Sequence, residues 1–134
     1  ADDNQLIYQR TPSVLLVEND AASIDVTRFF LKNKFILDIA LDGNEAVNKA
    51  KEKIYDAILM DINLGSGMTG LETTSEIRQL NGYETKPIIA LTAFEMEGDK
   101  EEFLAGGCSH YLSKPFDKKT IIELLTKLTL KSDL

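Results

Sequence analysis

The stretch that decides the fold is VLLVEND, residues 14–20, in which four continuous apolar residues are followed by three polar ones. A short, continuous apolar run is typical of a strand that is buried on both faces of a sheet. Four further runs of this kind follow, at residues 35–40, 57–60, 88–91 and 111–112. The sequence therefore predicts five strands.

Segments with helical periodicity separate these runs. Asp42 with Glu45, and Thr69 with Glu72, have the spacing of capping boxes and predict helices that start near residues 43 and 70. A further helix is predicted between residues 94 and 105, before the glycines 106–107. Two amphipathic helices are predicted from apolar faces formed by Ala22, Val26, Phe29 and Phe30, and by Ile121, Leu124, Leu125 and Leu128.

Strand and helix thus alternate five times along the chain. This order favours an α/β fold with a doubly wound parallel sheet, right-handed crossovers and helices on both faces. The chain has 134 residues, of which 43% are hydrophobic, and this is enough for one folded domain. We expect residues 1–11 to be a polar lead-in or linker, 12–130 the domain, and 131–134 a C-terminal tail.

Charge and composition exclude several classes of function. Fifteen basic against 22 acidic residues give a net charge of −7, so we expect no direct binding to nucleic acid or to a membrane surface. The apolar runs are far shorter than the roughly 20 residues of a membrane-spanning helix. The single cysteine, Cys108, cannot form an internal disulfide and is predicted to be a small buried residue. A reducing, cytoplasmic setting fits this composition.

Polar residues follow the apolar runs, at the edge where ligands bind to parallel sheets. Carboxylate, amide and carbonyl oxygens suit Mg²⁺, and a bound cation would attract a phosphoryl group. Asp61 is the candidate nucleophile, because a carboxylate can form an aspartyl phosphate. The Thr92 hydroxyl and the Lys114 ammonium would bind the phosphoryl oxygens. The residues at this edge are Glu18, Asn19, Asp20, Asp61, Thr92, Lys114 and Pro115.

Four segments together carry a resemblance to a known family: VLLVEND at 14–20, MDINL at 60–64, ALTA at 90–93 and YLSKPF at 111–116. From about Ser13 to Leu130 the chain resembles the receiver domain of two-component response regulators. The resemblance implies a flavodoxin-like receiver fold with strand order 2-1-3-4-5 and five helices. It also implies that Asp61 is phosphorylated by a phosphohistidine on a histidine kinase or a histidine phosphotransfer protein.

The resemblance assigns roles to individual residues. It implies that Mg²⁺ (or Mn²⁺) binds to Glu18, Asn19, Asp61 and the backbone carbonyl of Asn63, and that Thr92 and Tyr111 move together as a switch. No other cofactor is implied. The domain would be a signalling phosphoacceptor, not an enzyme, with at most slow self-phosphorylation from acyl phosphates and slow autodephosphorylation. It could form a homodimer through the last two helices and the last strand.

One position departs from the family pattern. Receivers usually carry two adjacent acids after the first strand, whereas this chain has Glu18 followed by the neutral Asn19. Asp20 begins the next turn and is not expected to replace the missing ligand. We therefore expect weaker Mg²⁺ binding. The alternative is an atypical receiver that acts as a phosphorylation-independent protein-binding module.

Other interpretations of single motifs remain beside this one. Asn19 and Asp20 also suit the N-cap of a helix, Thr92 a turn, and Tyr111 the core. His110, the only histidine, is not expected to be catalytic. Residues 65–70 spell GxGxxG, but they follow the third strand and lack the acidic ribose ligand of a dinucleotide site. The chain is expected to be a stand-alone regulator or the receiver of a hybrid kinase.

Overall fold

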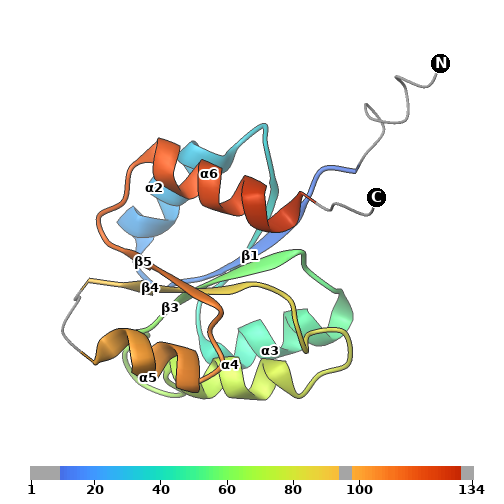
Figure 1. The fold of residues 1–134 in the computed structure, drawn as a ribbon, viewed down its shortest axis with the longest axis vertical. Helices are drawn as coiled ribbons and strands as arrows, with labels where there is room; N and C mark the ends of the chain where they lie inside the picture. The colour runs from blue at the N-terminus through green and yellow to red at the C-terminus, as the bar shows by residue number, and fades with distance from the viewer. Residues whose placement is uncertain (1–9, 94–97, 131–134) are drawn as a thin grey trace.

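Five parallel strands form one sheet in the computed structural model, which describes residues 10–93 and 98–130 (Figure 1). The strand order is β2-β1-β3-β4-β5, so the predicted doubly wound topology is confirmed. Residues 1–9 of the predicted lead-in, the tail at 131–134, and positions 94–97 of the predicted fourth helix lie outside the described residues. The strands are β1 (Ser13–Val17), β2 (Ile36–Ala40), β3 (Ala57–Asp61), β4 (Ile88–Thr92) and β5 (His110–Ser113).

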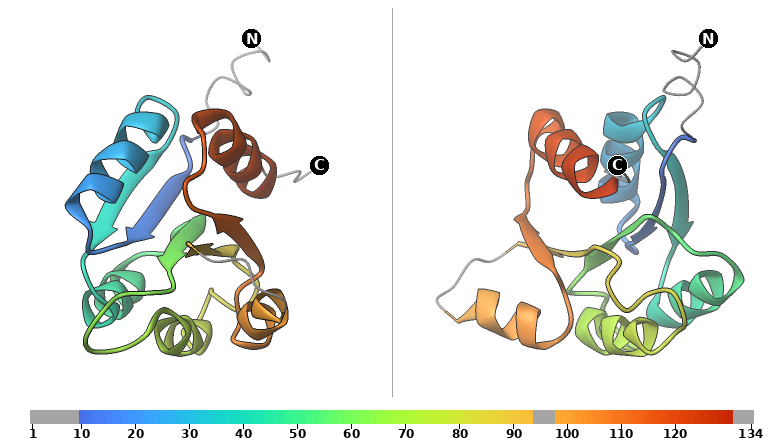
Figure 2. Two further views of the ribbon diagram at one scale, coloured as in Figure 1. Left: turned by 90° about the vertical axis from the view of Figure 1, so that its left-hand side faces the viewer. Right: turned by 45° about the vertical axis from the view of Figure 1, so that its right-hand side comes forward.

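The described helices cover both faces of this sheet. Helices α2 and α6 pack on one face, and α3, α4 and α5 pack on the other (Figures 1 and 2). The predicted starts at 43 and 70 are confirmed, and α5 ends at Ala105, directly before Gly106. None of these helices is both long and apolar enough to cross a membrane. Their bounds are α2 (Ala21–Leu31), α3 (Gly43–Glu52), α4 (Gly70–Arg78), α5 (Asp99–Ala105) and α6 (Lys118–Thr129).

The alternation of side chains along each strand divides the core into two layers. In β1, Leu15 and Val17 pack toward α3, α4 and α5, whereas Val14 and Leu16 pack toward α2 and α6. Every residue of β1, β3 and β4 is buried, as predicted for strands covered on both faces. Cys108 is also buried, in the layer beneath α5, as predicted.

The predicted apolar face of α2 is only partly correct: Phe30 is half-buried and packs against the core, but Ala22, Val26 and Phe29 are exposed. The helix buries the stripe Ile24, Thr27 and Leu31, while Val26 and Phe29 on the opposite side are 46% and 58% exposed. The helix is apolar on two sides, so periodicity alone does not decide which side meets the sheet. Instead, the ring of Phe29 lies beneath the ammonium groups of Lys32 and Lys118, 5.1 and 5.9 Å from its centroid.

Candidate functional site

The carboxyl ends of four strands deliver the predicted polar residues to one place. Asp61 and Thr92 are the last residues of β3 and β4, and Glu18 and Lys114 directly follow β1 and β5. Backbone hydrogen bonds continue past the strand ends, because Glu18 N–H donates to Ala40 O at 2.9 Å and Lys114 N–H donates to Thr92 O at 2.7 Å. These bonds fix the backbone from which the side chains project. The Lys114–Pro115 peptide bond is cis.

A pocket of about 280 Å³ opens between these strand ends. It brings together all the predicted metal and phosphoryl-binding positions, whereas Tyr111 does not line it. Sequence reasoning missed Ser23, which lies in the first turn of α2. It also missed the pocket's apolar wall, because side chains such as Leu91 and Ile62 look like ordinary core residues in the sequence. The lining residues are Glu18, Asn19, Asp20, Ser23, Asp61, Ile62, Asn63, Leu91, Thr92, Ala93 and Lys114.

Two buried carboxylates share one ammonium group at the base of this pocket. The Nζ atom of Lys114 lies 2.8 Å from Glu18 Oε1 and 3.7 Å from Asp61 Oδ1. Burial raises the pKa of Asp61 to about 7, and the hydrogen bond with Glu18 and the negative charge of Glu18 act in the same direction. Lys114 and the backbone N–H of Asn63 oppose this rise only in part. The site therefore carries negative charge that one lysine does not neutralise.

The oxygen atoms of this site fit a hard divalent cation. Glu18 and Asp61 supply carboxylate oxygens, and Asn63, whose N–H donates to Asp61 Oδ1 at 3.1 Å, also lines the pocket. Within residues 10–93 and 98–130, no three acidic, histidine or cysteine side chains are grouped to hold a metal. Mg²⁺ commonly binds through one or two carboxylates and keeps several waters, so a two-carboxylate site suits it.

The two residues after Glu18 have separate contacts. Asp20 is the N-cap of α2, and its carboxylate accepts from Ser23 N–H at 2.9 Å. The Nδ2 group of Asn19 donates to the carbonyl oxygen of Leu64 at 3.0 Å. The capping interpretation thus applies to Asp20 alone.

Tyr111 lies outside the pocket but on the same face of the sheet as Thr92. Its ring is half-buried and packs against the core layer beneath α5. Tyr111 pairs in register with Ala90, and Thr92 lies two residues further along β4, so both side chains project toward that layer. His110 also lies outside the pocket, and its ring nitrogen Nδ1 is 2.9 Å from Ser109 Oγ.

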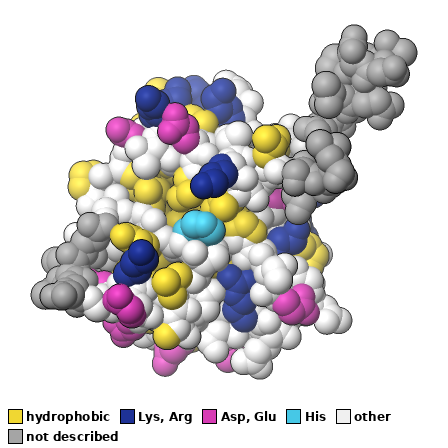
Figure 3. All heavy atoms as spheres, in the orientation of Figure 1, with side chains coloured by type: hydrophobic (Ala, Val, Ile, Leu, Met, Phe, Trp, Pro, Cys, Tyr) yellow, Lys and Arg dark blue, Asp and Glu magenta, His cyan; other side chains and the backbone are white. Residues whose placement is uncertain are grey.

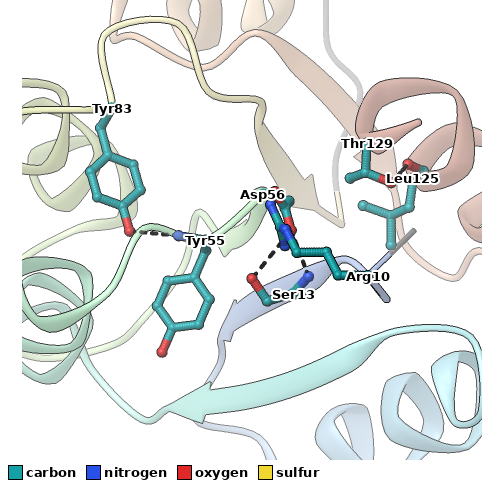
Figure 4. A network of polar contacts seen from close by, with 7 residues as sticks. All are labelled: Arg10, Ser13, Tyr55, Asp56, Tyr83, Leu125 and Thr129. Atoms are coloured by element: carbon teal, nitrogen blue, oxygen red, sulfur yellow. Dashed lines mark hydrogen bonds and ion pairs between the residues drawn. The ribbon is translucent and has the colours of Figure 1, made fainter. Parts of the chain in front are cut away.

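A second polar network lies at the opposite, amino end of the sheet (Figure 4). Asp56, directly before β3, accepts two hydrogen bonds of 2.8 Å from the Arg10 guanidinium and one of 2.8 Å from Ser13 N–H. Beside it, Tyr55 N–H donates to the hydroxyl of Tyr83 at 3.0 Å. These groups satisfy one another, and none of them lines the pocket described above.

Comparison with known proteins gives the family of the chain. The profile of the response regulator receiver domain matches residues 14–126, which is most of the sequence. The chain belongs to the response regulator receiver family. Its fold, strand order and number of helices are those expected for a receiver, and it is a domain of two-component signal transduction.

Similar receivers occur both alone and inside much longer proteins. The chain is 36% identical over 116 residues to the polar-differentiation response regulator DivK of Brucella ovis, covering 86% of the chain and 94% of DivK. It is 38% identical over 130 residues to hybrid signal transduction histidine kinase I of Dictyostelium discoideum, covering 91% of the chain but only 7% of that kinase. This receiver therefore resembles whole small regulators as well as single segments of hybrid kinases.

One solved structure with the same fold is a receiver domain that contains a metal ion. The receiver domain of the sensor histidine kinase PA1611 from Pseudomonas aeruginosa PAO1 is 34% identical to the chain, with a TM-score of 0.83. The alignment covers 91% of this receiver and all of that domain, which holds a magnesium ion in its active site cleft. The chemotaxis protein CheY4 of Vibrio cholerae has the same TM-score at 29% identity, covering 89% of this receiver and 99% of CheY4.

Proposed function

We propose that this receiver is a phosphorylation-dependent switch in which Asp61 accepts a phosphoryl group from a phosphohistidine. One observation carries the proposal: the Asp61 side chain is only 8% exposed, lines an open pocket, and lies 3.7 Å from a lysine ammonium. An oxygen of Asp61 would form a bond to phosphorus while the P–N bond of the donor breaks. The donor imidazole keeps the electron pair of that bond.

Glu18, Asp61, the Asn63 carbonyl and Asn19 would hold Mg²⁺ (or Mn²⁺) in this proposal. A bound cation would neutralise negative charge on the carboxylates and on the phosphoryl oxygens. The oxygen ligands around the pocket and the magnesium ion in the cleft of the PA1611 receiver support Mg²⁺ as the ion. Lys114 would move its ammonium contact from Glu18 and Asp61 to a phosphoryl oxygen, and it would thereby compensate the charge that the new group adds.

Thr92 and Tyr111 would report the phosphoryl group to the rest of the domain. Thr92 lines the pocket at the end of β4, and Tyr111 lies on the neighbouring strand on the same face. A hydroxyl that turns toward a phosphoryl oxygen leaves space beside the half-buried tyrosine ring. The switch would thus change the surface formed by α5, β5 and α6.

That surface is the proposed site of a homodimer. Strand β5 is an edge of the sheet and is flanked by α5 and α6. Apolar side chains surround the histidine on this face (Figure 3), and Leu104 of α5 is 44% exposed. The phosphodonor would be a histidine kinase or a histidine phosphotransfer protein, as the similarity to hybrid kinases indicates. A cytoplasmic location is part of this proposal and agrees with the free, buried Cys108 thiol.

A mass measurement tests the proposed function. Incubation with a small acyl phosphate and Mg²⁺ should add about 80 Da, the mass of one phosphoryl group, in an adduct that is stable in acid and labile in base. Asp61→Asn should abolish the adduct. An adduct that persists in Asp61→Asn, or that maps to His110, would contradict the proposal.

The same measurement distinguishes the proposed switch from the alternative function. A protein-binding module that works without phosphorylation would show no adduct and no response to Mg²⁺. The observation that favours it is the neutral Asn19, which leaves two carboxylates at the cation site. A partner that binds equally well with and without acyl phosphate would support this alternative.

A second variant tests the switch separately from the chemistry. Thr92→Ala should still accept the phosphoryl group on Asp61 but should lose the change in partner affinity, because the hydroxyl and the acceptor carboxylate do different work. Partner affinity measured before and after phosphorylation is the readout. A full response in Thr92→Ala would leave Thr92 as a turn residue only.

A further inference from the structure

The side chain of Asn19 makes a contact that neither helix capping nor metal binding requires. Its Nδ2 group donates to the Leu64 carbonyl at 3.0 Å and so connects the end of β1 to the segment that follows β3. Asp20 alone caps α2, so Asn19 is free of that role. We infer that Asn19 is a positioning residue, whose amide holds the segment 61–64, and with it the Asn63 carbonyl, at the pocket.

The held segment has a fixed point on each side of Asn63. On one side, Asn63 N–H donates to Asp61 Oδ1 at 3.1 Å. On the other side, Leu64 has its side chain buried in the core and its carbonyl oxygen bonded to Asn19. The chain then turns away at Gly65, which has a φ of +83° and would place a Cβ atom 3.5 Å from Asn19 Nδ2. Without the Asn19 contact, the backbone after Asn63 would be held only by the buried side chain of Leu64.

The donor in this contact is an amide, which an ionised aspartate cannot replace. An asparagine side chain carries both a donor and an acceptor, whereas an ionised aspartate carries acceptors only. An aspartate at position 19 would face the Leu64 carbonyl with a second acceptor and would have to turn away from it. Asn19 therefore replaces a unit of charge at the cation site with a bond that orders a neighbouring ligand, and its Oδ1 atom remains an acceptor.

This inference rests on the proposed function, because the position of the Asn63 carbonyl matters only if the pocket receives a cation. It changes what is expected of Asn19→Asp. The added charge should tighten Mg²⁺ binding, but the metal-free segment should become less ordered. A residue that was only a weak ligand would show the first effect without the second.

Hydrogen–deuterium exchange of the peptide 62–68, in chelator and without a phosphodonor, tests the inference. Asn19→Asp and Asn19→Ala should both exchange about three- to tenfold faster than the parent, which is the effect of one net hydrogen bond on a local opening. Asp20→Asn is the matched control, since it also changes one charge at the pocket edge but keeps a side chain that caps helices. Its exchange over 62–68 should equal that of the parent.

Two results would overturn the inference. Exchange at the parental rate in both Asn19 variants would show that the amide does not hold the segment. An equal acceleration in Asp20→Asn would show that any side-chain change at this edge of the pocket loosens the segment, and not the loss of the Asn19 amide contact in particular. A titration with Mg²⁺, monitored by the midpoint of thermal unfolding, adds a second readout. The affinity of the protein for Mg²⁺ should rise in Asn19→Asp and fall in Asn19→Ala. Because the exchange needs neither Mg²⁺ nor phosphorylation, a failure to phosphorylate Asp61 would reject the proposed function without deciding this result.

Discussion

Strand β3 has a buried aspartate at each end, and the two are in opposite electrostatic states. Asp56, before the strand, and Asp61, its last residue, are 7% and 6% exposed. Burial acts to raise the pKa of Asp56, but the hydrogen bonds and charge of Arg10 and the Ser13 N–H outweigh it, so the pKa lies below its usual value. Burial raises the pKa of Asp61 to about 7, and Glu18 adds to the rise.

The difference shows how one strand can carry two buried acids with different electrostatic surroundings. Asp56 has a guanidinium of its own and a backbone donor, so its charge is compensated within the domain. Asp61 shares the Lys114 ammonium with Glu18. The Nζ atom of Lys114 lies 3.7 Å from the Asp61 carboxylate but only 2.8 Å from that of Glu18. An incompletely compensated carboxylate in an open pocket is suited to bind a cation and then a phosphoryl group.

The largest stability effect is expected from Asp56→Ala. The change leaves the buried Ser13 N–H without its acceptor and removes the partner of Arg10, so the free energy of unfolding should fall by about 2–4 kcal/mol. Chemical denaturation of the parent and the variant measures this difference. A loss below about 0.5 kcal/mol would mean that the amino-end network does not stabilise the domain.

The opposite sign is expected from Asp61→Asn. Removal of a buried charge that Lys114 cannot fully compensate should raise the free energy of unfolding by about 1–3 kcal/mol at pH 7.5 in chelator. The parent should be stabilised when Mg²⁺ is added, and the variant should respond less. Destabilisation by Asp61→Asn in chelator would show that the carboxylate is already compensated in the metal-free domain.

The two aspartates should also divide the pH dependence of stability. The pKa of Asp61 is higher in the folded than in the unfolded chain, so its contribution is fully present below about pH 4 and is lost as the pH rises through 7. The pKa of Asp56 is lowered by folding, so its contribution is present above about pH 4 and is lost as the pH falls.

Denaturation of the metal-free protein at several pH values measures both effects. Between pH 5 and 8 the parent should lose about 1–2 kcal/mol, and Asp61→Asn should remove most of this loss. Asp56→Asn should instead flatten the loss below pH 4. A slope between pH 5 and 8 that persists in Asp61→Asn would assign it to another group.

The smallest effect is expected from Arg10→Ala. The Arg10 side chain is 70% exposed, so water already screens its charge, and the loss should be about 0.5–1 kcal/mol. Arg10→Lys should recover little of this loss, because an ammonium cannot make the two parallel bonds to Asp56. A loss as large as that of Asp56→Ala would show that the pair acts as a single unit.

The sequence predicts the sheet and the pocket well because both depend on local patterns. Each strand is a short apolar run, and parallel topology alone brings Glu18, Asp61, Thr92 and Lys114 to one edge. The buried side of α2 could not be predicted in this way, because both Val26–Phe29 and Ile24–Leu31 are apolar and only the packing against the sheet chooses between them. The two sets of residues alternate along one helix, and tertiary contacts decide which set is buried.

The sequence also does not predict contacts between residues that are far apart along the chain. Asn19 and Leu64 are 45 residues apart, and Arg10 and Asp56 are 46 apart. Nothing in either local pattern indicates these pairs. Arg10 belongs to the predicted lead-in 1–11, yet its guanidinium contacts the domain at Asp56.

The most direct test of the opposition between the two aspartates is a site-resolved titration of their carboxyl carbons by NMR, with and without Mg²⁺. In chelator, Asp61 should titrate near pH 7 and Asp56 below its usual value of about 3.9. Saturating Mg²⁺ should lower the midpoint of Asp61 and leave that of Asp56 unchanged. If both aspartates titrate near pH 4 and neither responds to Mg²⁺, the account of Asp61 as an uncompensated, cation-dependent acceptor is contradicted.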